Sequence, residues 1–140
     1  MRIARRLSLL AAVMAAVLVG AGAPAHAAEP PANIHWLYTT TGSGAMFFDA
    51  DLEGYPSYEK ITVCDNRTDD RGIYALLEGV DPHGDGPTDY VYYEFRDPSN
   101  DGQCRSWATN YFADGYKVRA EVCEYHGEIL EYCRWGSGVA

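Results

Sequence analysis

Residues 115–134, GYKVRAEVCEYHGEILEYCR, contain the sequence pattern that decides the fold class. Val118, Ala120 and Val122 alternate with charged residues, which is the two-residue period of a strand with one buried face. The dipeptide His126-Gly127 then supplies a turn, and a second alternating segment follows it. This stretch therefore predicts an antiparallel hairpin that packs one face against a core.

Short segments of the same kind recur along the chain, separated by turns rich in Asp and Gly. The other expected strands cover residues 45–49, 59–64, 72–80, 90–96 and 105–112. No window of ten residues has the 3.6-residue period of a helix. Seven or eight short strands at this spacing are typical of a sandwich, so we expect an all-β, immunoglobulin-like antiparallel β-sandwich. The tyrosine corner of true immunoglobulin domains is missing, because Glu121 stands two residues before Cys123.

The N-terminal residues 1–27 have the three parts of a secretory signal peptide. Arg2, Arg5 and Arg6 are followed by an apolar run over 7–20 and by the small residues of Ala25-His26-Ala27. We expect cleavage after Ala27 and a secreted, extracellular protein. The pattern leaves the Sec and Tat export routes open.

Four cysteines lie in the mature chain: Cys64, Cys104, Cys123 and Cys133. An even number in an exported chain predicts two disulfides, and their spacings are not those of a zinc site. Three pairings are open, and we favour Cys64–Cys104 with Cys123–Cys133. A two-residue turn at His126-Gly127 would place Cys123 opposite Leu130, so the second bridge requires a wider loop or a bulge.

The mature chain is strongly acidic. Loss of Arg2, Arg5 and Arg6 with the signal leaves eight of the 11 Lys and Arg residues against 20 Asp and Glu residues, a net charge of −12. This charge repels phosphates and anionic headgroups, so we expect no nucleic-acid partner and no membrane association after cleavage. It favours solubility, cationic partners or divalent cations.

Residues 28–44 are expected to form an extended N-terminal arm and linker before a sandwich domain over 45–140. Ile34, Trp36 and Tyr38 share one parity, and a flexible Thr-Gly-Ser break follows them at 39–44. Two alternatives stay open for this arm. It adds a strand to the sheet of another protein, or it is the first strand of its own sandwich.

Aromatic residues are the second feature that indicates recognition. Alternation places Tyr90 and Tyr92 on the outer face, opposite in parity to Val91, Tyr93 and Phe95. Tyrosine and tryptophan supply rigid contact area in binding surfaces. The candidate partner-binding residues are Ile34, Trp36, Tyr38, Tyr90 and Tyr92. The candidate residues for a sugar-binding platform are Trp36, Trp107 and Trp135.

Two acidic loops partly match calcium-binding loops. Asp49 and Asp51 stand at the first and third positions of one, and Asp81 and Asp85 at the first and fifth of the other. Both lack the bidentate Glu of an EF-hand, which is replaced by Lys60 in the first loop. These aspartates are weak candidates for a calcium site, and no other cofactor is expected.

No catalytic signature was found in the sequence. There is no GxSxG motif, and the mature histidines, His35, His83 and His126, lie beside expected turns or the arm. Paired cysteines offer no thiolate nucleophile. Acid pairs such as Glu121 and Glu131 have no sugar cleft that the sequence predicts. No catalytic residue is therefore assigned, and we expect a protein that is not an enzyme.

Several motifs resemble those of a known group of proteins. They are Phe47-Phe48-Asp49-Ala50-Asp51, Val63-Cys64-Asp65-Asn66-Arg67, Asp70-Arg71-Gly72, the segment 118–123 and Glu131-Tyr132-Cys133. Together they resemble small secreted actinobacterial proteins, largely uncharacterised, that combine a signal peptide with a four-cysteine β-sandwich. The resemblance implies fold and location. Some small secreted sandwiches of actinobacteria are adaptors in antibacterial toxin particles and dock through an N-terminal strand, with which the arm over 34–38 is compatible.

The expected function is that of a secreted, non-catalytic binding protein with an extracellular protein partner. An adaptor subunit of a toxin-like extracellular assembly is one form of this function. The alternatives are a secreted carbohydrate-binding module and a small extracellular hydrolase.

Overall fold

The computed structural model describes residues 29–98 and 101–140. The expected signal peptide, residues 1–27, lies outside the described residues. The elements of the described part are all strands, and in chain order they are β1 (Ile34–Tyr38), β2 (Gly44–Asp49), β3 (Glu59–Asp65), β4 (Gly72–Val80), β5 (Tyr90–Asp97), β6 (Cys104–Thr109), β7 (Lys117–His126) and β8 (Ile129–Val139). Within the described ranges no helix is long and apolar enough to cross a membrane.

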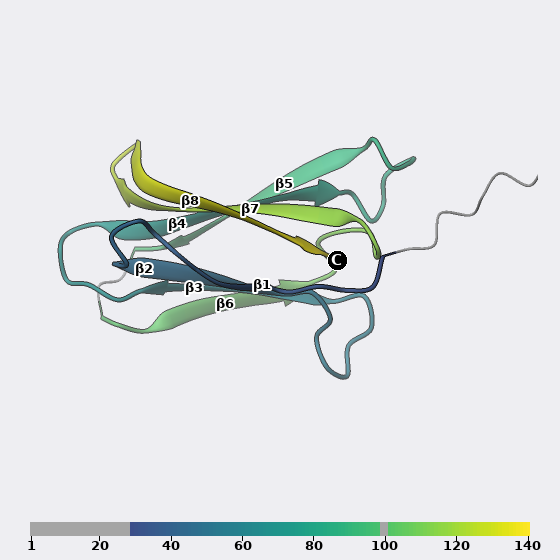
Figure 1. The fold of residues 1–140 in the computed structure, drawn as a ribbon, viewed down its shortest axis with the longest axis horizontal. Coiled ribbons are helices and arrows are strands. Elements are labelled where there is room, and N and C mark those ends of the chain that lie inside the picture. The colour runs from purple at the N-terminus through teal and green to yellow at the C-terminus, as the bar shows by residue number, and fades with distance from the viewer. Residues whose placement is uncertain (1–28, 99–100) are drawn as a thin grey trace, which may run out of the picture.

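The strands form two antiparallel sheets that lie one over the other (Figure 1). We call the sheet with order β1-β2-β3-β6 sheet I and the sheet with order β5-β4-β7-β8 sheet II. The predicted all-β sandwich with two disulfides is confirmed. Its strand order differs from the ABED and CFG sheets of an immunoglobulin domain, so the similarity is one of architecture.

The core lies between the sheets and follows the alternation read from the sequence. Strand β7 turns Val118, Ala120 and Val122 inward, and each is at most 1% exposed. Aliphatic and aromatic side chains from both sheets complete the core, and the largest apolar side chains that are fully buried are Phe48, Phe112, Met46, Ile61, Ile73 and Leu77. Burial of this apolar surface is the main source of stability in such a fold.

The β7–β8 hairpin contains the bulge that the second disulfide needs. Tyr125 lies opposite Leu130, but the register shifts between Val122 and Glu124. Tyr132, in the bulged stretch, has a positive φ of 56°. The shift brings Cys133 to Cys123, and the two sulfurs are bonded. The preferred pairing is therefore confirmed.

The turn of this hairpin lies one residue later than predicted, at Gly127-Glu128. Gly127 has a φ of 60°, whereas Glu128 is not among the positive-φ residues. A positive φ at the first central position only is the requirement of a type II′ turn, which places glycine there.

The other disulfide needs no bulge, because Cys64 and Cys104 are direct register partners in β3 and β6.

Residues 34–38 form strand β1, so of the two alternatives left open for the arm the first-strand alternative is the one observed. Tyr38 pairs with Ala45 of β2, and the expected division after residue 44 falls within β2, which begins at Gly44. Ala32 also pairs with Val139, with two backbone hydrogen bonds of 2.9 Å. The amide of Thr40 donates to the carbonyl of Tyr132 at 2.9 Å. These bonds join β1 to β8 and close one side of the sandwich.

Candidate functional site

The outer face of sheet II brings together side chains from four strands that are distant in sequence. Register partners in an antiparallel sheet share a face. The first row of partners on this face is Tyr92, Glu78, Arg119 and Ser137, and the second is Glu94, Leu76, Glu121 and Trp135. Tyr90 and Tyr74 continue the face along β5 and β4. We call these residues the outer face of sheet II.

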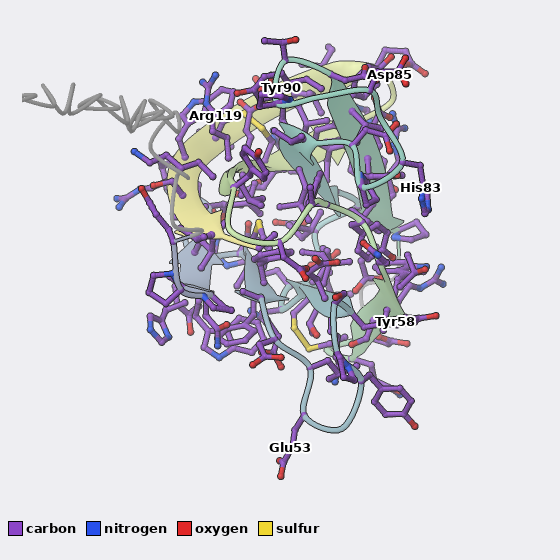
Figure 2. All side chains as sticks on the ribbon, turned by 90° about the vertical axis from the view of Figure 1, so that its right-hand side faces the viewer. Glu53, Tyr58, His83, Asp85, Tyr90 and Arg119 are labelled. Atoms are coloured by element: carbon purple, nitrogen blue, oxygen red, sulfur yellow. A yellow bond between two sulfur atoms is a disulfide. The ribbon has the colours of Figure 1, made fainter. Side chains whose placement is uncertain are left out.

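Large aromatic rings are exposed on this face. Tyr90 is 60% exposed, Tyr92 is 69% exposed and Trp135 is 58% exposed. Figure 2 shows Tyr90 and Arg119 near one end of this sheet. Tyr74, Leu76 and Tyr92 also line a shallow depression together with the carboxylates of Glu78 and Glu94. The face is therefore apolar over much of its area without being buried.

Arginine side chains contact three aromatic rings of sheet II, and one of these rings is the exposed ring of Trp135. The guanidinium of Arg119 lies 5.7 Å from the ring centre of Trp135. That of Arg96 lies 5.5 Å from the ring centre of Tyr74 and 5.2 Å from that of Tyr125. Such cation–π contacts restrict both partners, so the aromatic surface loses little conformational freedom when it binds.

The charges of this face are mostly compensated. Arg119 lies 3.6 Å from Glu78, and Arg96 lies 3.9 Å from Glu94. In a chain with a net charge of −9, this is a region where opposite charges are paired. An acidic partner would therefore meet less repulsion here than elsewhere on the molecule. Burial raises the pKa of Tyr74 to about 12, and the nearby charge of Glu94 contributes to this rise.

The structure separates the five residues predicted to bind a partner. Tyr90 and Tyr92 are exposed on sheet II, as alternation predicts. Trp36 and Tyr38 are 46% and 50% exposed, but they belong to sheet I. Ile34 is 4% exposed and packs in the core, so its assignment as a contact residue is wrong. The cause is a register shift between Ile34 and Leu37, which places Ile34 and Trp36 on opposite faces despite their shared parity.

The tryptophans proposed for sugar binding also separate. Trp107 faces inward and packs against Phe95, with 5.2 Å between the ring centres, so it offers no surface platform. Trp36 and Trp135 are exposed on the outer faces of sheets I and II. The sequence did not predict that Arg119 and Trp135 share a surface with Tyr92, because only the order of the strands in sheet II makes them neighbours.

The aspartates considered for calcium lie at one end of the sandwich, in and beside two loops. Figure 2 shows Glu53 at the tip of the β2–β3 loop, and His83 and Asp85 in the β4–β5 loop, well apart. Asp81 accepts the backbone amide of His83 at 2.8 Å, which is an ordinary turn contact. Among the described residues, none of these aspartates joins a group of three possible ligands.

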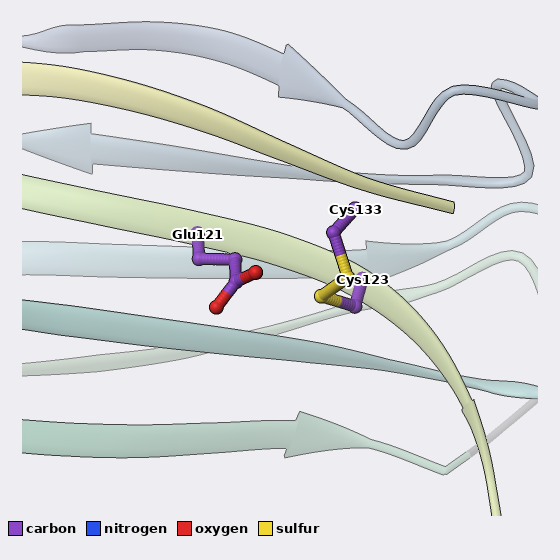
Figure 3. Close-up of side chains that lie close together, drawn as sticks. All are labelled: Glu121, Cys123 and Cys133. Carbon is purple, nitrogen blue, oxygen red and sulfur yellow. A yellow bond between two sulfur atoms is a disulfide. The ribbon is translucent and has the colours of Figure 1, made fainter. Parts of the chain in front are cut away.

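Only one such group occurs in the described part of the chain: Glu121, Cys123 and Cys133, drawn in Figure 3. The two sulfurs are bonded to each other, so they are not thiolates and do not bind a metal. What remains is a single carboxylate, and burial raises the pKa of Glu121. This cluster is a carboxylate packed beside a disulfide.

Buried carboxylates lie at both ends of the core. At one end, Glu124 accepts the hydroxyl of Ser43 at 2.5 Å and the hydroxyl of Thr41, and Arg71 lies 3.7 Å away. Nearby, Asp65 accepts the amide of Arg67 at 3.1 Å. Burial is the main reason that the pKa of Asp65 rises to about 6. The contacts of Glu124 stabilise the loop between β1 and β2, so they are structural.

At the other end, Glu59 is fully buried at the start of β3. Its Oε2 accepts the backbone amide of Tyr111, while Oε1 has no hydrogen-bond partner in the described residues. Burial raises the pKa of Glu59 to about 7, with the hydrogen bond from Tyr111 acting in the opposite direction. The carboxylate fixes the β6–β7 loop against the core.

The three histidines of the described residues, His35, His83 and His126, are exposed. His35 packs edge-on against Phe47, with 6.1 Å between ring centres.

Comparisons with known protein families, with curated proteins and with solved structures found no match to this chain.

Proposed function

We propose that this protein is a secreted, non-catalytic binding protein that contacts an extracellular protein partner through the outer face of sheet II. The observation that carries the proposal is the exposure of Tyr90, Tyr92 and Trp135 on one face. Exposed apolar patches of this kind, with charged residues around them, are typical of protein interaction sites. The signal peptide predicted over residues 1–27 and the two disulfides support the extracellular location.

The composition of the face supports a protein partner. Tyrosine, tryptophan and arginine are the residues that most often supply binding energy at protein interfaces. Here Trp135 and Arg119 are already in contact, and Tyr92 is a register neighbour of Glu78, which pairs with Arg119. A flat sheet surface with rigid side chains fits another folded protein better than a small molecule, which prefers a concave pocket.

An adaptor role within a larger extracellular assembly is one form of this function, as the resemblance to actinobacterial sandwiches implies. Docking through a free N-terminal strand does not fit the structure, because β1 pairs with β2 and contacts β8. An adaptor built on this chain would instead use the sheet face.

The test is a capture experiment with the mature, oxidised protein as bait in culture supernatant. The face variants Tyr92→Ser and Trp135→Ser are compared with the control variant Tyr55→Ser, since Tyr55 is 61% exposed on the β2–β3 loop. We expect a protein that is captured by the wild type and the control and lost with both face variants. Capture that is equal for all four baits would refute the proposal for this face.

A further inference from the structure

Sheet I has a groove of its own on its outer face, on the opposite side of the molecule from the face described above. The groove has a volume of about 230 Å³ and is lined by Trp36, Tyr38, Ala45, Cys64, Asn66 and Cys104. Tyr38, Ala45, Cys64 and Cys104 are successive register partners across the four strands of the sheet. The groove thus runs across the sheet, from the aromatic rings of β1 to the disulfide between β3 and β6.

The shape of the groove follows from side-chain size. Ala45 is the smallest residue of its row and is 2% exposed, because larger groups rise around it. Tyr38 and Trp36 stand on one side, 50% and 46% exposed, and the disulfide stands on the other. Trp36 is supported by Phe47, with 5.5 Å between ring centres. Both rings are therefore accessible, and the ring of Trp36 is also supported by Phe47.

The residues that line the groove carry no charge, in a chain where 22% of residues are charged. Asn66 contributes an exposed carboxamide, which both donates and accepts hydrogen bonds. Thr62 and Ser106 share a hydroxyl–hydroxyl hydrogen bond of 2.9 Å on the neighbouring row of the same face. An ionic ligand would leave its charge without an opposite partner here.

The geometry points to a binding site for a neutral saccharide, with one sugar ring stacked against Trp36 and Tyr38 and its hydroxyls bonded to Asn66. The apolar C–H face of a pyranose packs on an aromatic ring, while its hydroxyl groups need both donors and acceptors. A carboxamide supplies both. The site lies on sheet I, so it is separate from the protein-binding face proposed on sheet II.

The size of the groove limits the ligand. Sites for drug-sized molecules usually measure ~300–1,000 Å³, and this groove is smaller and open at the surface. It therefore fits a single ring of a longer chain, with the neighbouring rings in solvent. An extended proline-rich peptide needs several successive aromatic slots, whereas this groove provides one pair of rings and a polar side.

The experiment screens the mature, oxidised protein against an array of neutral glycans that includes hexamers of glucose and of N-acetylglucosamine. Saturation-transfer NMR then measures the binding of those hexamers that bind best in the array. The variants are Trp36→Ala, Tyr38→Ala and Asn66→Ala. Tyr55→Ala, which removes a ring that is 61% exposed on the β2–β3 loop and outside both proposed sites, is the matched control. Near-ultraviolet circular dichroism establishes that each variant is folded.

We expect at least one neutral glycan to bind, with affinity reduced at least tenfold by Trp36→Ala or Tyr38→Ala and unchanged by Tyr55→Ala. Asn66→Ala should weaken binding and reduce discrimination between sugars that differ in one hydroxyl. Absence of binding across the array would overturn the proposal, as would binding that survives all three groove variants. If decaproline bound to the groove rings and no glycan did, the site would be a peptide site instead. None of these results affects the test on sheet II.

Discussion

The backbone amide of Tyr111 donates a hydrogen bond of 2.7 Å to the carboxylate of Glu59, which is fully buried between the two sheets. The bond connects the β6–β7 loop to the first residue of β3. Only Oε2 of the carboxylate accepts this bond, and Oε1 has no hydrogen-bond partner among the described residues. A buried carboxylate with this environment makes stability depend on pH.

The first prediction concerns the replacement Glu59→Gln. The pKa of Glu59 is about 7 in the folded state, against 4.5 as the ordinary value, so the folded protein binds more protons between these pH values. Stability is therefore expected to decrease as pH rises from 4.5 to 7, by an amount on the order of 3 kcal/mol from this group. The uncharged Gln removes this contribution.

Urea unfolding of the wild type and of Glu59→Gln at pH 5, 6, 7 and 8 measures the effect. The variant should gain stability relative to the wild type between pH 5 and pH 7, and the difference should be constant above that. Asp65 titrates in an overlapping range in both proteins, so its effect cancels in the comparison. Parallel curves for the two proteins would contradict the prediction.

The second prediction concerns the disulfides. Cys64 and Cys104 are 40 positions apart, whereas Cys123 and Cys133 are 10 apart. Loop-closure entropy gives a stabilisation of ~4 kcal/mol for the first bridge and ~3 kcal/mol for the second. Replacement of Cys64 and Cys104 by Ser should thus lower the unfolding free energy more than replacement of Cys123 and Cys133. A reversed order in chemical unfolding would show that strain or local packing dominates.

The third prediction tests the closure between β1 and β8. A Cβ atom at position 138 would meet the carbonyl oxygen of Ala32 and lie 2.9 Å from a carbon of Ile34. Because a backbone oxygen cannot move aside easily, Gly138→Ala should destabilise the protein by ~1–3 kcal/mol. Gly86→Ala is the control, since nothing lies within 4 Å of its added Cβ. Equal unfolding free energies for both variants would argue against the contact with Ala32.

The fourth prediction distinguishes the two sides of β1. Ile34→Ala removes a core side chain that is 4% exposed and should cost ~2–4 kcal/mol. Tyr38→Ala removes a half-exposed ring and should change stability by less than ~0.5 kcal/mol. Thermal unfolding of both variants measures this difference. If Ile34→Ala unfolded like the wild type, β1 would not be an integral strand.

Local sequence patterns were sufficient for much of this fold. The alternation in β7 identifies its inward residues, and the position of Cys123 and Cys133 on the two sides of one hairpin turn favours the pairing that is found. The same patterns failed at positions where one extra residue changes the side of a strand. The register shift after Ile34 is such a position, and it depends on packing against another strand. The bulge before Cys133 is expected only because the preferred disulfide requires a wider loop or a bulge.

The candidate surface on sheet II required information of another kind. Tyr92 and Trp135 are 43 positions apart in the chain, and their shared face follows from the strand order β5-β4-β7-β8. No period in a single segment specifies that order. For Glu59, in contrast, the sequence of one strand contains the signal. Its parity with Ile61 and Val63 indicates an inward position, although a carboxylate is rarely found buried.

Both disulfides join neighbouring strands of the same sheet, so each one removes a stretch of chain from the path between the two termini. At ~3.5 Å per residue, the stretches behind the bridges correspond to ~140 Å and ~35 Å of extended chain. In a single-molecule pulling experiment, the oxidised protein should therefore lengthen by ~175 Å less than the reduced protein. A protein that connects partners outside the cell would, with these two bridges, act as a tether of short and fixed reach under tension.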